Sequence, residues 1–256
     1  MPRLSEADPD LLGSIRGIVF DKDGTLADLE QRWVPFFSRI ISTVADYGGD
    51  PEIEKTLASA LGVAGGRFEP GSPAAVKSEG ELAAIALGHL AERGWSEDDA
   101  AAALLAGVEA ASFGALVPLG DVAGTMTALS GRFELGVATS DNRDNTLSEL
   151  VELGIADLVS AVHCGDDGNG VKPQPEVLWG ITRSWSLEPG QVLFVGDSMQ
   201  DHDTARAAGC RFIAVDPGPP EEPSAVAMAA DAWVASVEEL VGPGRGGGRL
   251  PSTACV

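Results

Sequence analysis

Residues 17–26 read Gly-Ile-Val-Phe-Asp-Lys-Asp-Gly-Thr-Leu, and this stretch decides the fold class. Its first four residues form a short, continuous apolar run, which is typical of a strand buried on both faces of a parallel sheet. Because strand side chains alternate, Asp21 and Asp23 are expected on the same side, about 7 Å apart along the chain. Two carboxylates that close repel each other unless a cation or a shared proton relieves them. We therefore expect an acidic site at the carboxyl end of a buried strand, where open α/β sheets place their ligands.

Apolar runs alternate with helix-length segments in the second half of the chain. Further strands are predicted at residues 133–138, 158–163, 191–195, 211–215 and 231–234. Helices are predicted at residues 119–130, 142–153, 175–184 and 200–208. This alternation predicts an α/β domain with a parallel sheet, built from residues 14–27 and 118–241.

Residues 28–117 interrupt that alternation. No strand-like run occurs there, and helical patterns cover residues 30–47, 51–61, 79–93 and 96–112, with a Gly/Pro-rich loop at 62–77. We expect residues 28–117 to form an all-helical cap domain that is inserted after the first strand. Residues 242–256 are Gly-rich, and a disordered tail is expected there.

Composition narrows the classes of partner. The chain has 256 residues and a net charge of −22, so nucleic acid and anionic membrane surfaces are disfavoured as partners. Neither a signal peptide nor an apolar run of about eighteen residues is apparent, and a cytoplasmic location is the default expectation. The irregular spacing of Cys164, Cys210 and Cys255 does not suggest disulfides or zinc, and the first two are expected to be small buried hydrophobes.

Three more polar segments follow predicted strands. They are Thr139-Ser140, Lys172, and the pair Asp197 and Asp201 in Gly-Asp-Ser-Met-Gln-Asp. Taken singly, each has a plain explanation: a helix cap, a surface lysine, or an acidic loop that begins a helix. Together with the first acidic pair they place four carboxylates, a hydroxyl and an ammonium at one edge of one sheet. A hard cation with oxygen ligands explains that set, and Mg²⁺ fits best because it also binds phosphates.

The motifs resemble those of the haloacid dehalogenase (HAD) superfamily, in the branch whose helical cap follows the first strand. Phosphoglycolate phosphatases and β-phosphoglucomutases belong to that branch. The four signature motifs correspond, in order, to residues 21–25 (DKDGT), 139–140 (TS), 172 (K) and 196–201 (GDSMQD). The resemblance covers residues 14–241 and implies a Rossmann-like α/β core with an inserted helical cap.

The resemblance also implies roles for these residues. Asp21 would be the nucleophile that forms an aspartyl-phosphate, and Asp23 would be the general acid and base. Mg²⁺ would be held by Asp21, by the backbone carbonyl of Asp23, and by Asp197, with Asp201 positioning a ligand or a water. The implied activity is Mg²⁺-dependent hydrolysis of a small phosphorylated metabolite, such as phosphoglycolate.

The same resemblance implies how phosphate is held. Thr139 and the backbone amides of Gly24 and Ser140 would bind the phosphoryl oxygens. Lys172 would neutralise the nucleophile and the transferring group. The cap would close over this edge and provide specificity.

Other positions leave alternatives open. Many phosphatases of this branch carry an apolar or aromatic residue where this chain has Lys22, which either adds positive charge near the site or faces solvent. The cap candidates for specificity are Arg32, Trp33 and Arg67, each of which could instead be structural or solvated. Asp23 disfavours dehalogenation, because the dehalogenases lack a carboxylate at that position.

Rival functions also stay open at this point. A sugar-phosphate mutase of the same fold would protect its phosphoenzyme from water, and no cap residue that does so can be identified. A phospho-Asp receiver would need an acceptor aspartate at the end of residues 133–140, where none stands. An inactive binding homologue would need a reason that four chemically complete motifs do not supply. The particular substrate and the oligomeric state are not determined.

Overall fold

The computed structural model describes residues 3–6, 13–69, 71–219 and 222–241. Its main feature is a parallel six-stranded sheet with the order β5-β4-β1-β6-β7-β8, which confirms the predicted α/β class. Every strand predicted in the α/β part is present, and β1 occupies the middle between β4 and β6. The strands are β1 (Gly17–Phe20), β4 (Glu134–Ala138), β5 (Ala161–His163), β6 (Val192–Gly196), β7 (Arg211–Val215) and β8 (Ala232–Val234).

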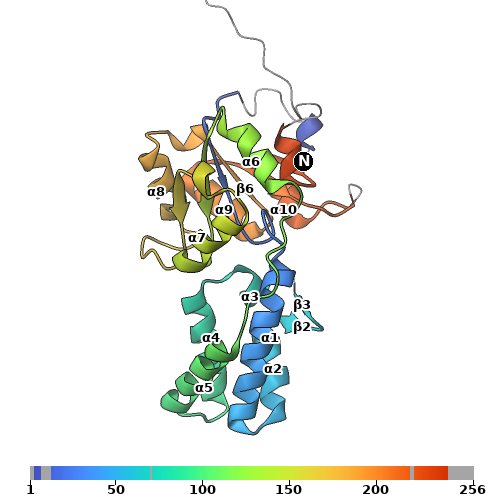
Figure 1. The fold of residues 1–256 in the computed structure, drawn as a ribbon, viewed down its shortest axis with the longest axis vertical. Coiled ribbons are helices and arrows are strands. Elements are labelled where there is room, and N and C mark those ends of the chain that lie inside the picture. The colour runs from blue at the N-terminus through green and yellow to red at the C-terminus, as the bar shows by residue number, and fades with distance from the viewer. Residues whose placement is uncertain (1–2, 7–12, 70, 220–221, 242–256) are drawn as a thin grey trace, which may run out of the picture.

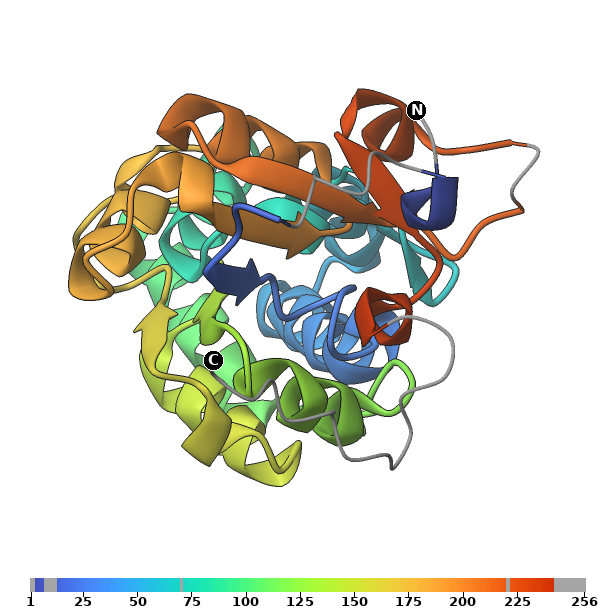
Figure 2. The ribbon, with the colours of Figure 1, turned by 90° about the horizontal axis from the view of Figure 1, so that it is seen from above.

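Helices cover both faces of this sheet, as Figure 2 shows. Ile18 and Phe20 of β1 pack with one layer, whereas Val19 packs with the other, so the apolar run of β1 is buried on both sides. The first layer holds α6 (Val122–Ser130), α7 (Arg143–Glu152) and the 3₁₀ turn η4 (Val237–Val241). The second layer holds α8 (Glu176–Ser184), α9 (Met199–Ala208) and the short α10 (Ala225–Ala229), which was not predicted. Three further 3₁₀ turns are η1 (Leu4–Glu6), η2 (Ala156–Leu158) and η3 (Pro189–Gln191).

The segment after β1 forms a separate bundle at one end of the molecule (Figure 1). One apolar cluster draws all its members from this segment. Asp28 begins the first helix by accepting a hydrogen bond from Gln31 N, and Gly49 ends it in the left-handed conformation. The helices are α1 (Leu29–Gly48), α2 (Pro51–Leu61), α3 (Pro73–Val76), α4 (Glu79–Glu92) and α5 (Glu97–Ala110).

The prediction of an all-helical insertion is wrong in one detail. Two short antiparallel strands, β2 (Val63–Ala64) and β3 (Arg67–Phe68), form a hairpin within the expected loop. Gly65 and Gly66 make the two-residue connection, and both have positive φ, which favours a tight hairpin turn. Strands of two residues are too short to produce an alternating pattern in the sequence.

The chain leaves and re-enters the α/β part at neighbouring points. Asp28 N donates to Val117 O at 2.8 Å, and Leu119 N donates to Leu26 O at 2.9 Å. The two connections therefore run side by side at the positions where the insertion was expected to begin and end. No helix in the described residues is long and apolar enough to cross a membrane. The predicted tail at 242–256 lies outside the described residues.

Candidate active site

The sheet order brings the predicted motifs to one place. Because β4, β1 and β6 are adjacent and parallel, Thr139, Asp21 and Asp197 follow neighbouring strand ends, where the strand order reverses. Lys172, from the loop between β5 and α8, joins them. These four residues, together with Asp23, line one cavity of about 890 Å³.

Three carboxylates lie close together at the floor of this cavity: Asp21 and Asp197 line it, whereas Asp201 is fully buried and does not. One oxygen from each of Asp21, Asp197 and Asp201 lies within 4.8 Å of the others. Burial raises the pKa of Asp21 well above its ordinary value, against the attraction of Lys172. Burial, and then repulsion from Asp201, raise the pKa of Asp197 to about 7. Buried oxygen ligands that repel one another fit a hard divalent cation, which would stabilise their ionised forms.

Lys172 provides the positive charge of this floor. Its Nζ donates to Asp21 Oδ1 at 2.5 Å and to Asp201 Oδ1 at 2.7 Å. Burial alone would lower the pKa of Lys172, but the two carboxylates raise it above its ordinary value, so the side chain is an ammonium. The other oxygen of Asp201 accepts from the Ser198 hydroxyl at 2.6 Å, and Gln200 donates to Lys172 O at 2.7 Å. The lysine is thus held at both its backbone and its charged end.

Gly24 allows the first and last motifs to touch. It has φ of +89°, and a Cβ at this position would lie 2.3 Å from Asp197 Oδ2. Thr25 donates to Asp197 Oδ1 at 3.1 Å and so orients that carboxylate. This role of Thr25 was not predicted, although the position of Thr25 directly after the glycine was a signal for it.

Asp23 contacts the insertion directly. Its Oδ1 accepts from Trp33 Nε1 at 2.9 Å, and its Oδ2 pairs with Lys22 Nζ at 2.7 Å. Trp33 lies in α1 and lines the cavity, so one of the three cap candidates reaches the site. Both oxygens of Asp23 therefore have a partner, one of which belongs to the insertion.

Lys22 is fully buried, so the alternative that it faces solvent is wrong. Besides Asp23, its Nζ pairs with Asp141 at 3.0 Å and with Glu149. Burial alone would lower the pKa of Lys22, but the three carboxylates raise it above its ordinary value. The unusual residue between the two acids is thus neutralised by its own set of carboxylates, and it does not line the cavity.

The other two cap candidates lie outside the cavity. Arg32 Nε pairs with Glu149 Oε1 at 2.5 Å, and its Nη1 donates to Gly114 O at 2.9 Å. Arg67 is largely exposed and lies 3.5 Å from Glu30 Oε2. The structure therefore gives Arg32 contacts within the fold and leaves Arg67 at the surface. Glu149 was missed, although it lies directly before the buried Leu150 in α7.

The Thr139-Ser140 segment contacts both halves of the site. Thr139 is buried, and its hydroxyl accepts from Asp141 N at 3.1 Å. The Ser140 hydroxyl donates to Val76 O, in α3 of the insertion, at 3.1 Å. Both residues line the cavity. The insertion therefore touches the α/β part at this edge through Ser140 and at Asp23 through Trp33.

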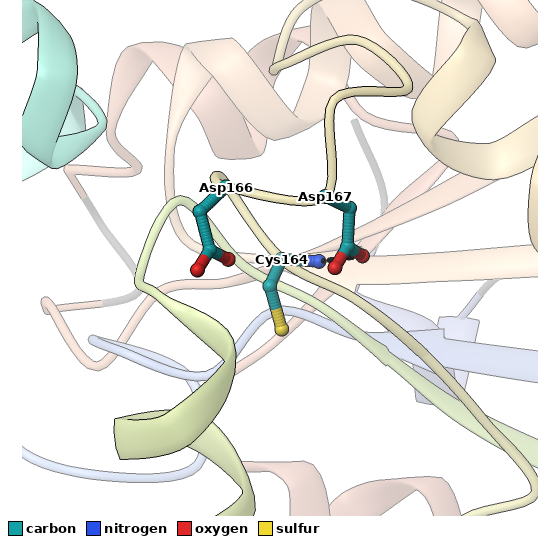
Figure 3. A group of neighbouring side chains, drawn as sticks. All are labelled: Cys164, Asp166 and Asp167. Carbon is teal, nitrogen blue, oxygen red and sulfur yellow. Dashed lines mark hydrogen bonds between the residues drawn. The ribbon is translucent and has the colours of Figure 1, made fainter.

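Figure 3 shows a second group of side chains of the types that bind metals, and none of its members lines the cavity. Ligand atoms of Cys164, Asp166 and Asp167 also lie within 4.8 Å of one another. Arg143 pairs with Asp167 at 2.6 Å, and Cys164 N donates to the same carboxylate at 2.8 Å. Burial raises the pKa of Cys164 to about 11, so it is a thiol at neutral pH. Cys164 and Cys210 are buried and free, as expected.

Comparisons with known proteins agree with the motifs. The family model of haloacid dehalogenase-like hydrolases matches residues 89–215. Phosphoglycolate phosphatase of Escherichia coli K12 is 37% identical over 98 residues, which are 38% of this chain and 39% of that protein. The matched segment thus spans well under half of that relative.

Solved structures resemble this chain over most of its length. A structure described as a predicted phosphoglycolate phosphatase from Haemophilus somnus has a TM-score of 0.66 at 20% identity, covering 89% of this chain and 97% of that one. A HAD phosphatase from Thermococcus onnurineus has a TM-score of 0.63 at 20% identity, covering 88% and 96%. These similarities show the fold. In its family match over residues 89–215, its fold and its four motifs at one edge of the sheet, the chain is similar to the haloacid dehalogenase-like hydrolases.

Proposed function

We propose that this chain is a Mg²⁺-dependent phosphatase that moves a phosphoryl group from a small phosphomonoester to Asp21 and then to water. One observation carries the proposal. Asp21 lies at the floor of a cavity, bonded to the Lys172 ammonium and within 4.8 Å of the ligand oxygens of Asp197 and Asp201. A nucleophilic carboxylate beside a fixed positive charge is what transfer from an anionic phosphate requires.

The first half-reaction forms an acyl phosphate. A carboxylate oxygen of Asp21 attacks phosphorus, and the bond from phosphorus to the ester oxygen breaks. Asp23 gives a proton to that oxygen, so the product leaves as a neutral alcohol. Lys172 balances the negative charge that gathers on the transferring group.

The second half-reaction returns the enzyme to its starting state. Asp23, now ionised, takes a proton from water, and the resulting hydroxide attacks phosphorus. The bond from phosphorus to Asp21 breaks, which releases inorganic phosphate and regenerates the Asp21 carboxylate, and Asp23 ends protonated as at the start of the cycle. Trp33 and Lys22 each contact one oxygen of Asp23. One of these two contacts must break before either step, so that an Asp23 oxygen is free to carry the proton.

The proposed binding set follows the same arrangement. The Thr139 hydroxyl and the amides of Gly24 and Ser140 would hold phosphoryl oxygens. Mg²⁺ would be held by the floor carboxylates and the Asp23 carbonyl, and when bound it offsets repulsion between nucleophile and phosphate. We further propose that residues 28–117 act as a cap domain over residues 14–27 and 118–241, and that the enzyme is cytoplasmic.

Phosphate release from p-nitrophenyl phosphate, with Mg²⁺ and with chelator, tests this function. We expect turnover only with the metal, its loss in Asp21→Asn, and its retention in the matched control Asp166→Asn, whose carboxylate does not line the cavity. No metal-dependent release from this ester or from a panel of phosphorylated metabolites would refute the phosphatase. Conversion of a sugar phosphate to its isomer without net phosphate release would assign a mutase instead.

A further inference from the structure

The cavity above the floor carboxylates is large and mostly apolar. Its volume of about 890 Å³ lies near the upper end of the roughly 300–1,000 Å³ of cavities that bury drug-sized ligands. The apolar wall comes from α1, β3, α4 and α5, and it includes Phe36, Phe37, Phe68, Leu82, Leu104 and Val108. A two-carbon phosphate ester bound at Asp21 would leave most of this wall in contact with water.

The charges around the cavity disfavour a second anionic group on the substrate. Among the described residues that line it, the basic side chains are Lys172, which is bonded to the floor carboxylates, and Lys77. Lys77 Nζ is paired with Glu81 at 2.6 Å. Acidic residues, by contrast, line the cavity from the insertion side, at Glu30, Glu69 and Glu79. The carboxylate of a phosphoglycolate-like substrate would face acidic side chains, and the nearest cations are already paired with carboxylates of the protein.

We propose that the preferred substrate is the phosphate monoester of a hydrophobic alcohol, with its phosphate at Asp21 and its apolar chain or ring against α1, α4 and α5. This inference rests on the phosphatase function proposed above. The phosphate is then the one anionic group of the ligand, and it lies beside Lys172. The apolar remainder covers the wall and gains affinity from each methylene that it buries.

A homologous series of substrates tests the preference. We would measure kcat/KM with Mg²⁺ for methyl, butyl and octyl phosphate and for phosphoglycolate. We expect an increase of about two- to fourfold for each methylene, so that octyl phosphate exceeds both methyl phosphate and phosphoglycolate by at least about 100-fold. A flat series, or phosphoglycolate as the best substrate, would overturn the inference and leave the phosphatase function intact.

Two substitutions on one helix localise the effect. Ala83 and Ala84 are exposed neighbours on α4, and of the two only Ala83 lines the cavity. Ala83→Phe should lower the ratio of octyl to methyl phosphate turnover at least tenfold, because the ring takes space from the chain. Ala84→Phe should leave that ratio unchanged. An equal response of the ratio to both substitutions would overturn the assignment of the apolar chain to this wall.

Binding separates a failure of this inference from a failure of the phosphatase. If no ester is hydrolysed, the proposed phosphatase function is refuted. Titration calorimetry with octyl phosphate and phosphoglycolate then still tests whether the cavity prefers an apolar ligand. Tighter binding of octyl phosphate, weakened by Ala83→Phe and not by Ala84→Phe, would support an apolar ligand. Equal binding of the two esters, or binding of neither, would overturn it.

Discussion

Two groups of side chains of the types that bind metals look alike in this protein when only distances are compared. Asp21, Asp197 and Asp201 form one, and Cys164, Asp166 and Asp167 form the other, each with ligand atoms within 4.8 Å. In the first group, Asp21 and Asp197 follow the ends of central strands and line the cavity, and a buried lysine contacts Asp21 and Asp201. The second lies in the loop after β5 (Figure 3), and none of its members lines that cavity.

The difference lies in what neutralises each group. Arg143 donates hydrogen bonds to both carboxylate oxygens of Asp167, at 2.6 and 2.7 Å, and this bidentate pairing stabilises the loop. In the first group, burial and then repulsion from Asp201 raise the pKa of Asp197 to about 7, although Lys172 acts to lower it. Incomplete neutralisation beside an accessible cavity distinguishes a candidate metal centre from a structural cluster.

The largest expected effect separates the two groups by catalysis. Asp21→Asn should lower kcat at least about 10⁴-fold, because the amide cannot act as the nucleophile. Asp166→Asn should stay within about twofold of the wild type. Steady-state kinetics and circular dichroism of both variants measure this. Comparable losses in the two folded variants would end the distinction between the groups.

Substitution of the basic residue beside each group, Lys172 or Arg143, should lower the free energy of unfolding by very different amounts. Lys172→Met leaves Asp21 and Asp201 buried without their ammonium and should cost about 3–5 kcal/mol of unfolding free energy. Arg143→Met should cost about 1 kcal/mol or less, because the Arg143 side chain is 41% exposed and solvent screens its pair. Urea denaturation of both metal-free variants checks the order, and a larger loss for Arg143→Met would contradict it.

Metal addition should stabilise the protein through the first group alone. At a Mg²⁺ concentration of about 100 times Kd, the native state gains about 2.7 kcal/mol. The resulting rise in Tm should be retained in Asp166→Asn and lost in Asp197→Asn. A chelator should remove the rise in the wild type. Retention of the full shift in Asp197→Asn would place the metal elsewhere.

The smallest expected effect concerns the thiol of the second group. Burial raises the pKa of Cys164 from 9.0 to about 11, so between these values the native state binds more protons than the unfolded state. Stability should therefore fall as pH rises from about 9 to 11, by about 1–2 kcal/mol from this residue. Cys164→Ala should show a shallower decline over that window in denaturant titrations. An identical slope would mean that the thiol titrates normally.

Local patterns in the sequence were sufficient for much of the α/β part. The apolar run of β1, repeated in the later strands, predicted a parallel sheet, since strands buried on both faces lack alternation. The strand-end position of each motif then predicted that Asp21, Thr139, Lys172 and Asp197 would meet, and they line one cavity. The hairpin of β2 and β3 was missed because two-residue strands leave no periodic signal.

The sequence by itself determined the fold class, the insertion point and the chemical types gathered at the sheet edge, because each depends on short-range patterns and on the geometry of parallel strands. Only the tertiary structure decided how Lys22 is neutralised, since Glu149 is 127 residues away along the chain. The tertiary structure likewise decided that Arg32 pairs with Glu149 outside the cavity and that Trp33 donates to Asp23. The partner of a long charged side chain is set by which helices pack together, and no local pattern encodes that choice.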